Sequence, residues 1–550
     1  MMDKLDLVMP EIAMFIATCV VMVLGLSPSR EVRRGCALFA AMGLFAAGAM
    51  RTMGADAAGG LFPELVPFAK GLIAIVGLLL LLLMAGTVDR EEDKLAASMP
   101  ERFDPLKANR AEFYAFFMFS LTGLMLVSSA DDLIWLFLAL ELTSLPTYIM
   151  VTISTRGTRS QEAGVKYFFL GALGAAIFLY GFALLYGATG STDLAEIAAT
   201  IQAQAASEEG LNPIASAGLV MSFIGLCFKI AAVPMHFYAA DVYQGAHSGV
   251  SAFLAFVPKA AGILAIMMIA GTAGWTHGQT GDALPDALYG VMWTVAALTM
   301  FVGNVLALLQ TSIKRMLAYS SIAHSGYMLV GIIAGPGSIA EFGADPTATF
   351  AENGLAAALF YLLCYGVMNA GAFAVVSCLE RNGKDGPTGE IDEIDDLRGL
   401  HRAHPHLAFA MVLCGLSLLG LPPLLGFFGK LGLFTSAIAA NEIALVVVLG
   451  LNSAIAAFYY LRIVVAAYLD PADEARTADL TVVPFPTRVI AAFASAGGVV
   501  LLAVLSQSLV SASLGAATYE APSRTDVNLA DKAGVEPVQA TSAEDDLSDG

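Results

Sequence analysis

The chain has 550 residues, of which 57% are hydrophobic and only 14% charged, and its mean hydropathy is +0.73. Soluble proteins carry about 25% charged residues, so this composition excludes an ordinary soluble globular protein. The formal net charge of −19 argues against nucleic acid as a partner.

Fourteen apolar runs follow one another along the chain, and most have about the length that a helix needs to cross a bilayer. They lie at 6–26, 36–53, 65–87, 111–129, 132–153, 162–187, 212–235, 248–271, 286–310, 316–335, 353–379, 406–440, 443–469 and 488–512. The run at 406–440 is too long for one plain span and contains Pro422-Pro423, which predicts one broken helix. The first run has no small-residue cleavage site, so we expect a retained helix and not a signal peptide. The sequence therefore predicts an all-α polytopic membrane protein of about fourteen helices.

The basic residues of the intervening loops alternate along the chain, as the positive-inside rule requires. With the N-terminus outside, the cytoplasmic loops hold Arg30, Arg33, Arg34, Arg90, Lys94, Arg102, Lys107, Arg110, Arg156, Arg159, Lys314, Arg315, Arg381, Lys384, Arg398, Arg402, Arg476 and Arg488. The opposite side holds Lys4, Arg51, Lys70, Arg524 and Lys532, and its loops at 188–211, 272–285 and 336–352 have no Lys or Arg. This pattern predicts both termini on the non-cytoplasmic side of a bacterial inner membrane. It also supports the helix count, since one missed helix would reverse every later loop.

The runs divide the chain into an N-terminal three-helix segment with a cytoplasmic loop (1–110), two groups of helices (111–271 and 286–469) and a last helix (470–512). Residues 513–550 are polar, acidic and aperiodic, and we expect a disordered tail.

No pattern in the sequence predicts a bound redox group or metal. The six cysteines all fall within apolar runs, and no two of them form a CxxC pair. Iron–sulfur and structural zinc sites need clustered ligands, and neither a dinucleotide fingerprint nor a P-loop is present. We therefore expect no cofactor on this chain.

Five basic residues remain inside the apolar runs: Lys166, Lys229, Lys259, Lys430 and Arg462. A charge at a helix centre costs about 2.5–3.5 kcal/mol on insertion scales, so buried lysines are retained only if they are paired, hydrated or in use. Arg462 fits a headgroup contact, and Lys166 follows Glu162 by four residues, the favourable order for a helical ion pair. Lys229, Lys259 and Lys430 fit a structural role poorly and are candidate proton carriers.

Glu141 lies in the strongly apolar stretch LIWLFLALELTSLPTYIM. A lone carboxylate at that depth needs a cationic partner or a proton. A lysine beside it can hold a proton and release it if the pair separates, because burial favours the neutral amine and a nearby carboxylate the ammonium.

Two runs carry helix breaks beside these charges. Lys229 precedes Pro234, and Lys430 follows the Pro422-Pro423 pair. Broken helices at corresponding places in two halves of a chain are typical of transporters. His236 and His324 could bridge proton transfers, because imidazole titrates near neutrality. The other histidines, His247, His277, His401, His404 and His406, have the positions of loop or interfacial residues.

These motifs resemble a known family. LALELTSLPTYIM, EAGVKYFFLGAL, FKIAAVPMHFYAADVYQGA, FVPKAAG, QTSIKRMLAYSSIAHSGYMLVG and LPPLLGFFGK are similar, in consistent order over about 110–440, to the antiporter-like subunits of proton-pumping NADH–quinone oxidoreductase, respiratory complex I. The lysine in GFFGK resembles the N-type subunits, whereas M-type subunits carry glutamate there.

The resemblance implies two inverted five-helix bundles with broken helices near 229–240 and 419–430. Glu141 would pair with Lys229, and His236 and Lys259 would continue a hydrated axis toward Lys430 on the exit side. NADH oxidation, flavin, iron–sulfur clusters and quinone reduction would belong to other subunits, and the partners would be other membrane subunits, including antiporter-like neighbours, and lipid. The chain departs from the family's usual PDVYEGAP stretch at Ala240, Gln244 and His247, which puts in doubt any role of the replaced glutamate.

Two alternatives remain open. A subunit of a multisubunit sodium/proton antiporter or of a membrane-bound hydrogenase would share the fold. A sodium site needs several hard oxygen ligands, and Glu141 is the one convincing deep carboxylate, which favours protons. A non-transporting scaffold of the membrane arm would explain the helices but not the line of lysines.

Overall fold

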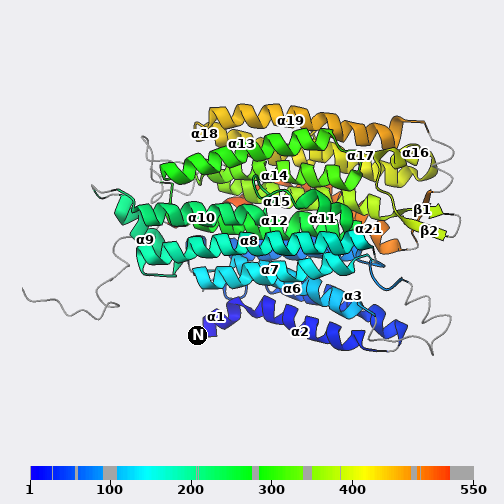
Figure 1. Cartoon of the computed structure of the whole chain (residues 1–550), viewed down its shortest axis with the longest axis horizontal. Coiled ribbons are helices and arrows are strands. Elements are labelled where there is room, and N and C mark those ends of the chain that lie inside the picture. Colours follow the sequence, from blue (N-terminus) through cyan, green and yellow to red (C-terminus); the bar gives the residue numbers. More distant parts are fainter. Residues whose placement is uncertain are drawn as a thin grey trace, which may run out of the picture.

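A computed structural model of the chain describes residues 2–27, 29–55, 60–90, 108–155, 157–205, 207, 210–275, 284–337, 350–383, 386–471, 480–483 and 485–520. The chain forms a bundle of long helices that run roughly parallel to its longest axis (Figure 1). The helices are α1 (Met2–Leu7), α2 (Met9–Gly25), α3 (Arg30–Ala49), α4 (Leu65–Leu83), α6 (Arg110–Ser128), α7 (Leu133–Ile153), α8 (Thr158–Thr189), α9 (Leu194–Ala205), α10 (Pro213–Lys229), α11 (Ala239–Gly245), α12 (Ser248–Ala273), α13 (Asp286–Leu308), α14 (Ile313–Ala334), α15 (Gly354–Ser377), η5 (Ile394–Leu397), α16 (Leu400–Ala403), α17 (Pro405–Leu419), α18 (Leu425–Ala439), α19 (Ile443–Val464), the π-helical turn η6 (Val465–Leu469), α21 (Pro486–Val504) and α22 (Ser506–Ala516).

Eleven helices of the described residues are long and apolar enough to cross a membrane. A helix rises 1.5 Å per residue, so about twenty residues span the hydrocarbon core. The three other predicted spans correspond to α2, to the pair α10 and α11, and to the pair α17 and α18. The prediction of about fourteen spans is therefore confirmed, and the chain is an integral membrane protein.

The first predicted helix break is present, since α10 ends at Lys229 and α11 begins at Ala239. Pro234 lies in the irregular segment between them. The second break is also present: α17 ends at Leu419, α18 begins at Leu425, and Pro422 and Pro423 lie between them.

The starts of α7 and α14 are built alike but lie at opposite ends of the bundle. Leu133 N donates to Thr192 O at 2.8 Å, and Leu194 N donates back to Asp131 O at 2.9 Å. In the second half, the same two-bond pattern joins the start of α14 to residues 392–394 (Ile313 N to Asp392 O, 2.6 Å; Ile394 N to Thr311 O, 2.9 Å). Residues 192–194 lead into α9, whereas 392–394 follow β2, and α9 and β2 lie at opposite ends (Figure 1). The two halves therefore repeat with inverted direction.

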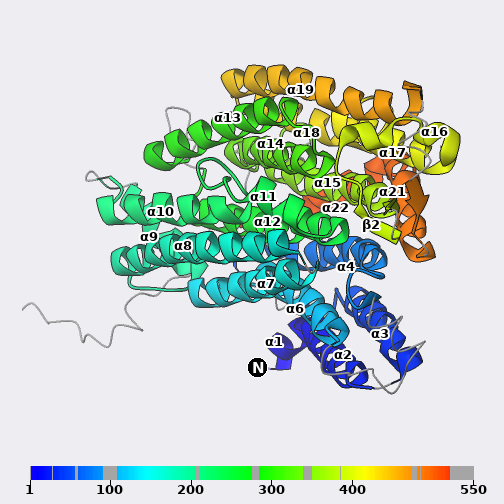
Figure 2. The ribbon, with the colours of Figure 1, turned by 45° about the vertical axis from the view of Figure 1, so that its right-hand side comes forward.

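Three helices form the centre of the bundle (Figure 2). The apolar windows of α12 and α15 are entirely buried within the chain, and that of α14 is 94% buried. Polar side chains on these helices face protein and not lipid. Protein groups at the centre of the bundle can therefore bond a charged side chain.

Two features at the ends differ from the sequence predictions. A three-stranded sheet, in the order β2-β1-β3, was not predicted and is formed by β1 (Leu379–Gly383), β2 (Gly386–Glu390) and β3 (Leu480–Val482). The prediction of a disordered tail from 513 is wrong for its first residues, because α22 continues to Ala516 and the Tyr519 hydroxyl donates to Gly271 O at 2.8 Å. Residues 521–550 lie outside the described residues.

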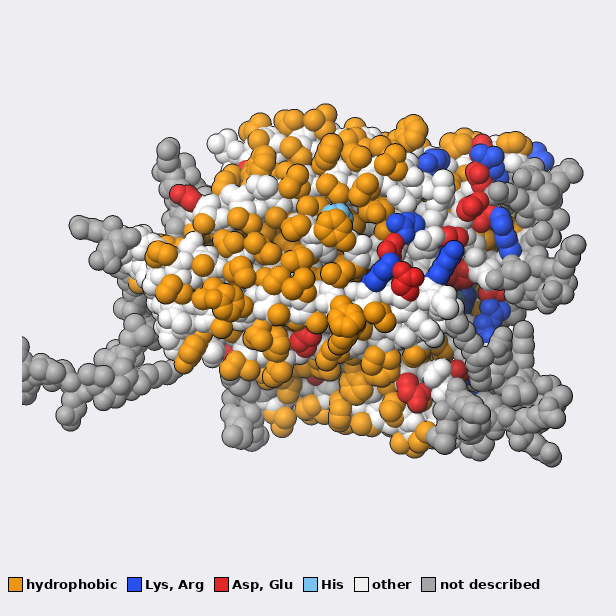
Figure 3. Space-filling view, viewed as in Figure 1, with side chains coloured by type: hydrophobic (Ala, Val, Ile, Leu, Met, Phe, Trp, Pro, Cys, Tyr) orange, Lys and Arg blue, Asp and Glu red, His pale blue; other side chains and the backbone are white. Residues whose placement is uncertain are grey.

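The loops predicted to be cytoplasmic meet at the end that carries the sheet. Arg90 pairs with Glu380, and Arg398 Nε lies 3.3 Å from Asp470 Oδ2. Blue and red side chains gather toward this end in Figure 3, while apolar side chains cover most of the remaining face. The two described chain ends lie at the opposite end, where Lys70 Nζ contacts Leu7 O and Glu520 N donates to Leu61 O.

Candidate functional site

The first deep lysine forms an ion pair with the predicted carboxylate. Lys229 Nζ lies 2.9 Å from Glu141 Oε1 and 2.5 Å from Ser144 Oγ. The Lys229 side chain is 1% exposed and that of Glu141 20%. Glu141 and Ser144 are one turn apart on α7, so both face the end of α10. The predicted pairing of Lys229 with Glu141 is present in the structure.

The break after α10 places Lys229 at the end of a helix. The Tyr238 hydroxyl donates to Phe228 O at 2.8 Å, so the segment after the break is bonded back to the end of α10. Ser325 Oγ on α14 donates to Ile230 O at 2.6 Å. Side chains thus satisfy carbonyls that an unbroken helix would bond internally.

Lys259 occupies the middle of α12, where its hydrogen-bond partners among the described residues are neutral oxygens. Its ammonium donates to the carbonyl of Ser321 and, at 2.7 Å, to Ser321 Oγ. The side chain is buried. A lysine held only by neutral oxygens can lose its proton without leaving an anion unpaired.

His324 lies one turn beyond Ser321 on α14 and is 1% exposed. Its Nδ1 lies 2.6 Å from the Tyr361 hydroxyl, and its Nε2 lies 2.9 Å from the Tyr460 hydroxyl. The imidazole thus joins α15 and α19 at the centre of the bundle.

Lys430, on α18, reaches back across the second break. Its Nζ donates to Leu419 O at 2.8 Å, at the end of α17. Gly420 has a φ of +91°, and a Cβ there would lie 2.9 Å from Lys430 Cδ. Glycine is required at this position both by its backbone conformation and by the approach of the lysine.

The three lysines share an aromatic environment. Each ammonium lies over a ring, Lys229 at 5.3 Å from Phe178, Lys259 at 5.2 Å from Tyr365 and Lys430 at 5.2 Å from Tyr327. A ring face stabilises a cation in a site with little water. The arrangement can therefore hold a charged lysine while excluding lipid.

Two candidates from the sequence are not joined to this line. His236 lies in the segment between α10 and α11, and its buried Nδ1 has no hydrogen-bond partner. Lys166 is 42% exposed and pairs with Glu162 at 2.7 Å and Asp241 at 3.0 Å. Lys166 and Glu162 therefore form a surface ion pair. Arg462 donates to Gln310 O just after the end of α13, and its expected headgroup contact stays a prediction.

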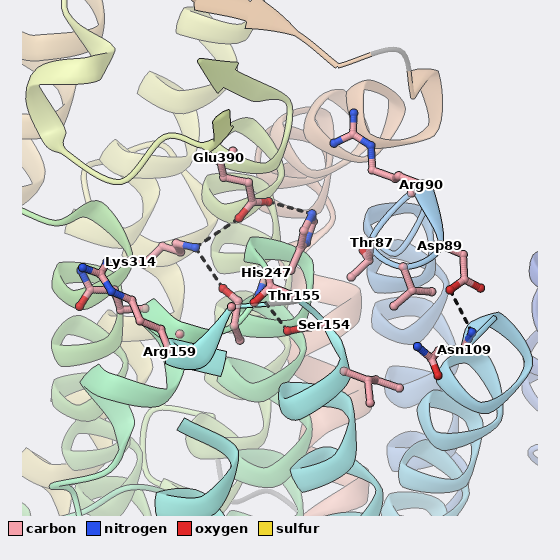
Figure 4. Close-up of a pocket in the computed structure, with 18 of the residues that line it drawn as sticks. Thr87, Asp89, Arg90, Asn109, Ser154, Thr155, Arg159, His247, Lys314 and Glu390 are labelled. Atoms are coloured by element: carbon pink, nitrogen blue, oxygen red, sulfur yellow. Dashed lines mark hydrogen bonds and ion pairs between the residues drawn. The ribbon is translucent and has the colours of Figure 1, made fainter. Parts of the chain in front are cut away.

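A pocket with a volume of 690 Å³ opens at the sheet end (Figure 4). Glu390 lies in its wall, with Oε1 2.9 Å from His247 Nε2 and Oε2 3.2 Å from Lys314 Nζ. Burial by itself would raise the pKa of the Glu390 carboxyl, but His247, Lys314 and Arg488 hold it well below its usual value. Burial lowers the pKa of the His247 imidazole, and Glu390 offsets this only in part.

Two of the three departures from the usual family stretch, Gln244 and His247, line this pocket. His247 accepts from Gly249 N through Nδ1 at 3.1 Å, which caps α12. Gln244 donates to Asp392 Oδ2 at 2.7 Å, and Ala240 is buried on α11. His247 was expected to be a loop or interfacial residue, but it is an almost fully buried helix cap.

The sequence reasoning missed several polar groups of the site. Ser144, Ser321, Tyr361 and Tyr460 bond the lysines and His324, and the paired serines of AYSSIAH next to a histidine were the available signal. Lys70 was counted among residues outside the membrane, yet it is buried on α4 and lies 2.9 Å from Glu11 Oε1. Glu141 is therefore not the one deep carboxylate. The described residues contain no group of three His, Cys, Asp or Glu side chains placed to hold a metal.

Comparison with known proteins shows which family this chain belongs to. The model of the family described as NADH:quinone oxidoreductase/Mrp antiporter, transmembrane, matches residues 130–456. The chain belongs to this family. It is 42% identical over 378 residues to NADH-quinone oxidoreductase subunit N of Myxococcus xanthus, covering 67% of this chain and 71% of that protein. It is 35% identical to subunit N of Rhodospirillum rubrum, covering 85% and 88%.

Solved structures of similar chains support the same family. A chain of respiratory complex I from Thermus thermophilus matches with a TM-score of 0.66 and 30% identity, over 92% of this chain and 99% of that chain. A chain of the Mrp complex from Dietzia has a TM-score of 0.67 at 20% identity, over 94% and 96%, which shows the shared fold. The predicted family is thereby confirmed.

Proposed function

We propose that this chain is the N-type, proton-translocating membrane subunit of a bacterial NADH:quinone oxidoreductase, and that its protons pass along Glu141, Lys229, Lys259, His324 and Lys430. The observation that carries the proposal is the Lys229–Glu141 pair, a buried ammonium whose counter-charge lies on a different helix. Its partners are other membrane subunits of the complex, including antiporter-like neighbours, and lipid.

The pair can act as a switch for proton affinity. While Glu141 lies beside Lys229, the carboxylate stabilises the ammonium. When the two helices separate, the ammonium loses its counter-charge in a low-dielectric site and gives up its proton more easily. Lys259 is the next acceptor, because neutral oxygens hold it.

Lys430 is the last carrier of the line. It lies at the second break, where its ammonium donates a hydrogen bond to the carbonyl of Leu419. His236 is a secondary candidate, since its unpartnered Nδ1 is available for a bond. We place the chain in the bacterial inner membrane, with the sheet end in the cytoplasm.

Redox chemistry belongs to partner subunits in this proposal. We expect no NADH, flavin, metal or iron–sulfur cluster on this chain, so a cofactor found in stoichiometric amount with the purified subunit would contradict it.

The test compares Lys229→Ala with Lys166→Ala in the assembled complex. Proton translocation per electron is measured in sealed vesicles, with assembly confirmed by subunit content. Lys229→Ala should lower translocation and coupled quinone reduction. Lys166→Ala should leave both unchanged, because an exposed pair contributes about 1 kcal/mol or less.

An ordinary proton-to-electron ratio in an assembled Lys229→Ala complex would instead support the scaffold alternative. If Lys229→Ala lowers the number of sodium ions moved per electron and leaves the number of protons unchanged, the result would support the antiporter-type alternative. If Lys229→Ala fails to assemble, Lys259→Ala carries the same test, since Lys259 is held by the neutral oxygens of Ser321 and its loss leaves no described carboxylate unpaired.

A further inference from the structure

His324 is held at both ring nitrogens by hydroxyl groups. Tyr361 on α15 lies 2.6 Å from Nδ1, and Tyr460 on α19 lies 2.9 Å from Nε2. All three side chains are at most 1% exposed. The ring of His324 is also nearly parallel to that of Tyr361, at 18°.

Hydrogen-bond chemistry restricts what this arrangement can do. A neutral imidazole has one N–H donor and one bare nitrogen, whereas a tyrosine hydroxyl both donates and accepts. Either tautomer is therefore satisfied, with one hydroxyl donating to the ring and the other accepting from it. The protonated ring is satisfied as well, because both hydroxyls can then accept.

Each end of this three-residue unit lies in the neighbourhood of a deep lysine. The Tyr460 hydroxyl also bonds Ser320 Oγ, and the neighbouring Ser321 holds the ammonium of Lys259. At the other end, the Tyr361 ring packs against α18 so closely that a Cβ on Gly429 would lie 2.6 Å from its Cδ2. Gly429 directly precedes Lys430.

We propose that Tyr460 and Tyr361 are further members of the proton path, and that His324 works between them as a neutral bridge. This inference rests on the proposed function. Tyr460 passes its hydroxyl proton to Nε2 while it takes one from the Lys259 side. Nδ1 passes its proton to the Tyr361 oxygen while the hydroxyl proton of Tyr361 leaves toward Lys430.

The step is balanced. One proton enters and one leaves, no bond between heavy atoms changes, and the imidazole stays neutral but in the other tautomer. The bridge avoids placing a lasting positive charge between two lysines, which would be costly in a low-dielectric site.

The test uses Tyr361→Phe, Tyr460→Phe and His324→Gln in the assembled complex. Each phenylalanine removes one hydroxyl and retains the ring, while glutamine can donate and accept but cannot exchange a proton between its two ends. Proton transfer through a positioned group contributes about 10²-fold or more, so all three variants should slow proton translocation by at least about tenfold.

Tyr459→Phe is the matched control. Tyr459 is the neighbouring residue, is fully buried and donates to Asn304 Oδ1 at 2.9 Å, so it also loses one buried hydrogen bond. It should lower the thermal midpoint as much as Tyr361→Phe does, since each variant loses one buried hydroxyl bond, and it should retain translocation. Thermal midpoint and subunit content thereby separate packing from proton transfer.

Wild-type translocation in assembled Tyr361→Phe or His324→Gln complexes would overturn the bridge. If Lys259→Ala still abolishes translocation in that case, the relay stands and another path crosses the centre. If Lys259→Ala also has no effect, the proposed function falls with the bridge.

Discussion

Lys229 Nζ lies 2.9 Å from Glu141 Oε1, so the last turn of α10 and the middle of α7 are joined by one partly buried ion pair. The two residues are 88 positions apart in the chain. The helix α10 ends directly at Lys229, so this lysine lies at a helix break and not within a continuous helix. The pair thus joins a titratable group at a helix end to a carboxylate within another helix.

Replacing Lys229 by arginine tests whether proton release is required. We expect an assembled complex with low translocation, because the guanidinium retains a positive charge beside Glu141 but cannot be deprotonated in a protein. The ratio of protons to electrons in sealed vesicles is the measurement. An arginine variant that pumps as well as wild type would show that Lys229 supplies charge and not a proton.

Glu141→Gln tests the counter-charge. The amide is similar in size, yet it leaves the Lys229 ammonium without its anion, so its proton affinity should fall. We expect slower translocation whose optimum shifts to lower pH, measured as the pH profile of coupled quinone reduction. Glu162→Gln is the control, because Glu162 is 64% exposed and pairs with Lys166 at the surface. Identical profiles for the two variants would contradict the switch.

Glu390 predicts an acid-sensitive sheet end. The pKa of its carboxyl is held well below the ordinary 4.5, so the native chain keeps it charged where the unfolded chain takes up a proton. This contribution is therefore fully present above about pH 4.5 and is lost as the pH falls toward the lowered value.

His247 also reduces the stability of the folded chain as the pH falls, and it does so at a higher pH than Glu390. The pKa of its imidazole is below the ordinary 6.5, so the unfolded state binds more protons as the pH falls below 6.5. The thermal midpoint of the purified complex should decline from pH 6.5 downward. Glu390→Gln should lower the thermal midpoint already at pH 7, because Lys314 and Arg488 lose their anion. The corresponding loss in the free energy of unfolding is about 3 kcal/mol. The further decline below pH 4.5 should be reduced. A midpoint unchanged by Glu390→Gln at pH 7 would contradict the cluster.

Single cysteines at the two ends test the orientation. Thr518 is exposed at the end that carries both described termini, and Asp395 is 51% exposed at the sheet end. In a Cys19→Ser background, the other native cysteines being buried, an impermeant thiol reagent should label Thr518→Cys in intact spheroplasts. Asp395→Cys should react only after permeabilisation. The reverse result would invert the proposed topology.

The helices and their breaks were readable from the sequence because they depend on local properties. An apolar run of about twenty residues must become a helix in a bilayer, since no water is present to bond its backbone. Pro234 and Pro422-Pro423 interrupt such runs for an equally local reason. The cost of a charge in hydrocarbon was enough to single out Lys229, Lys259 and Lys430.

The partners of those lysines were decided by the tertiary structure. Tyr361 and Tyr460 have no feature in the sequence that distinguishes them from other buried polar residues, and Ser321 is marked only by its place in the AYSSIAH stretch. Lys70 was mistaken for a residue outside the membrane because its partner, Glu11, is 59 positions away and lies near the start of the chain.

The sheet and the Glu390 cluster could not be predicted from the sequence for the same reason. β1 pairs with β3 across about a hundred residues, and Glu390 meets His247 and Lys314 from separate helices. Hydropathy, proline and charge act on neighbours along the chain, so the sequence by itself determined the spans, the breaks and the charged residues kept within them. Ion pairs and hydrogen bonds act on neighbours in space, and only the packing of the helices decided which of these residues meet.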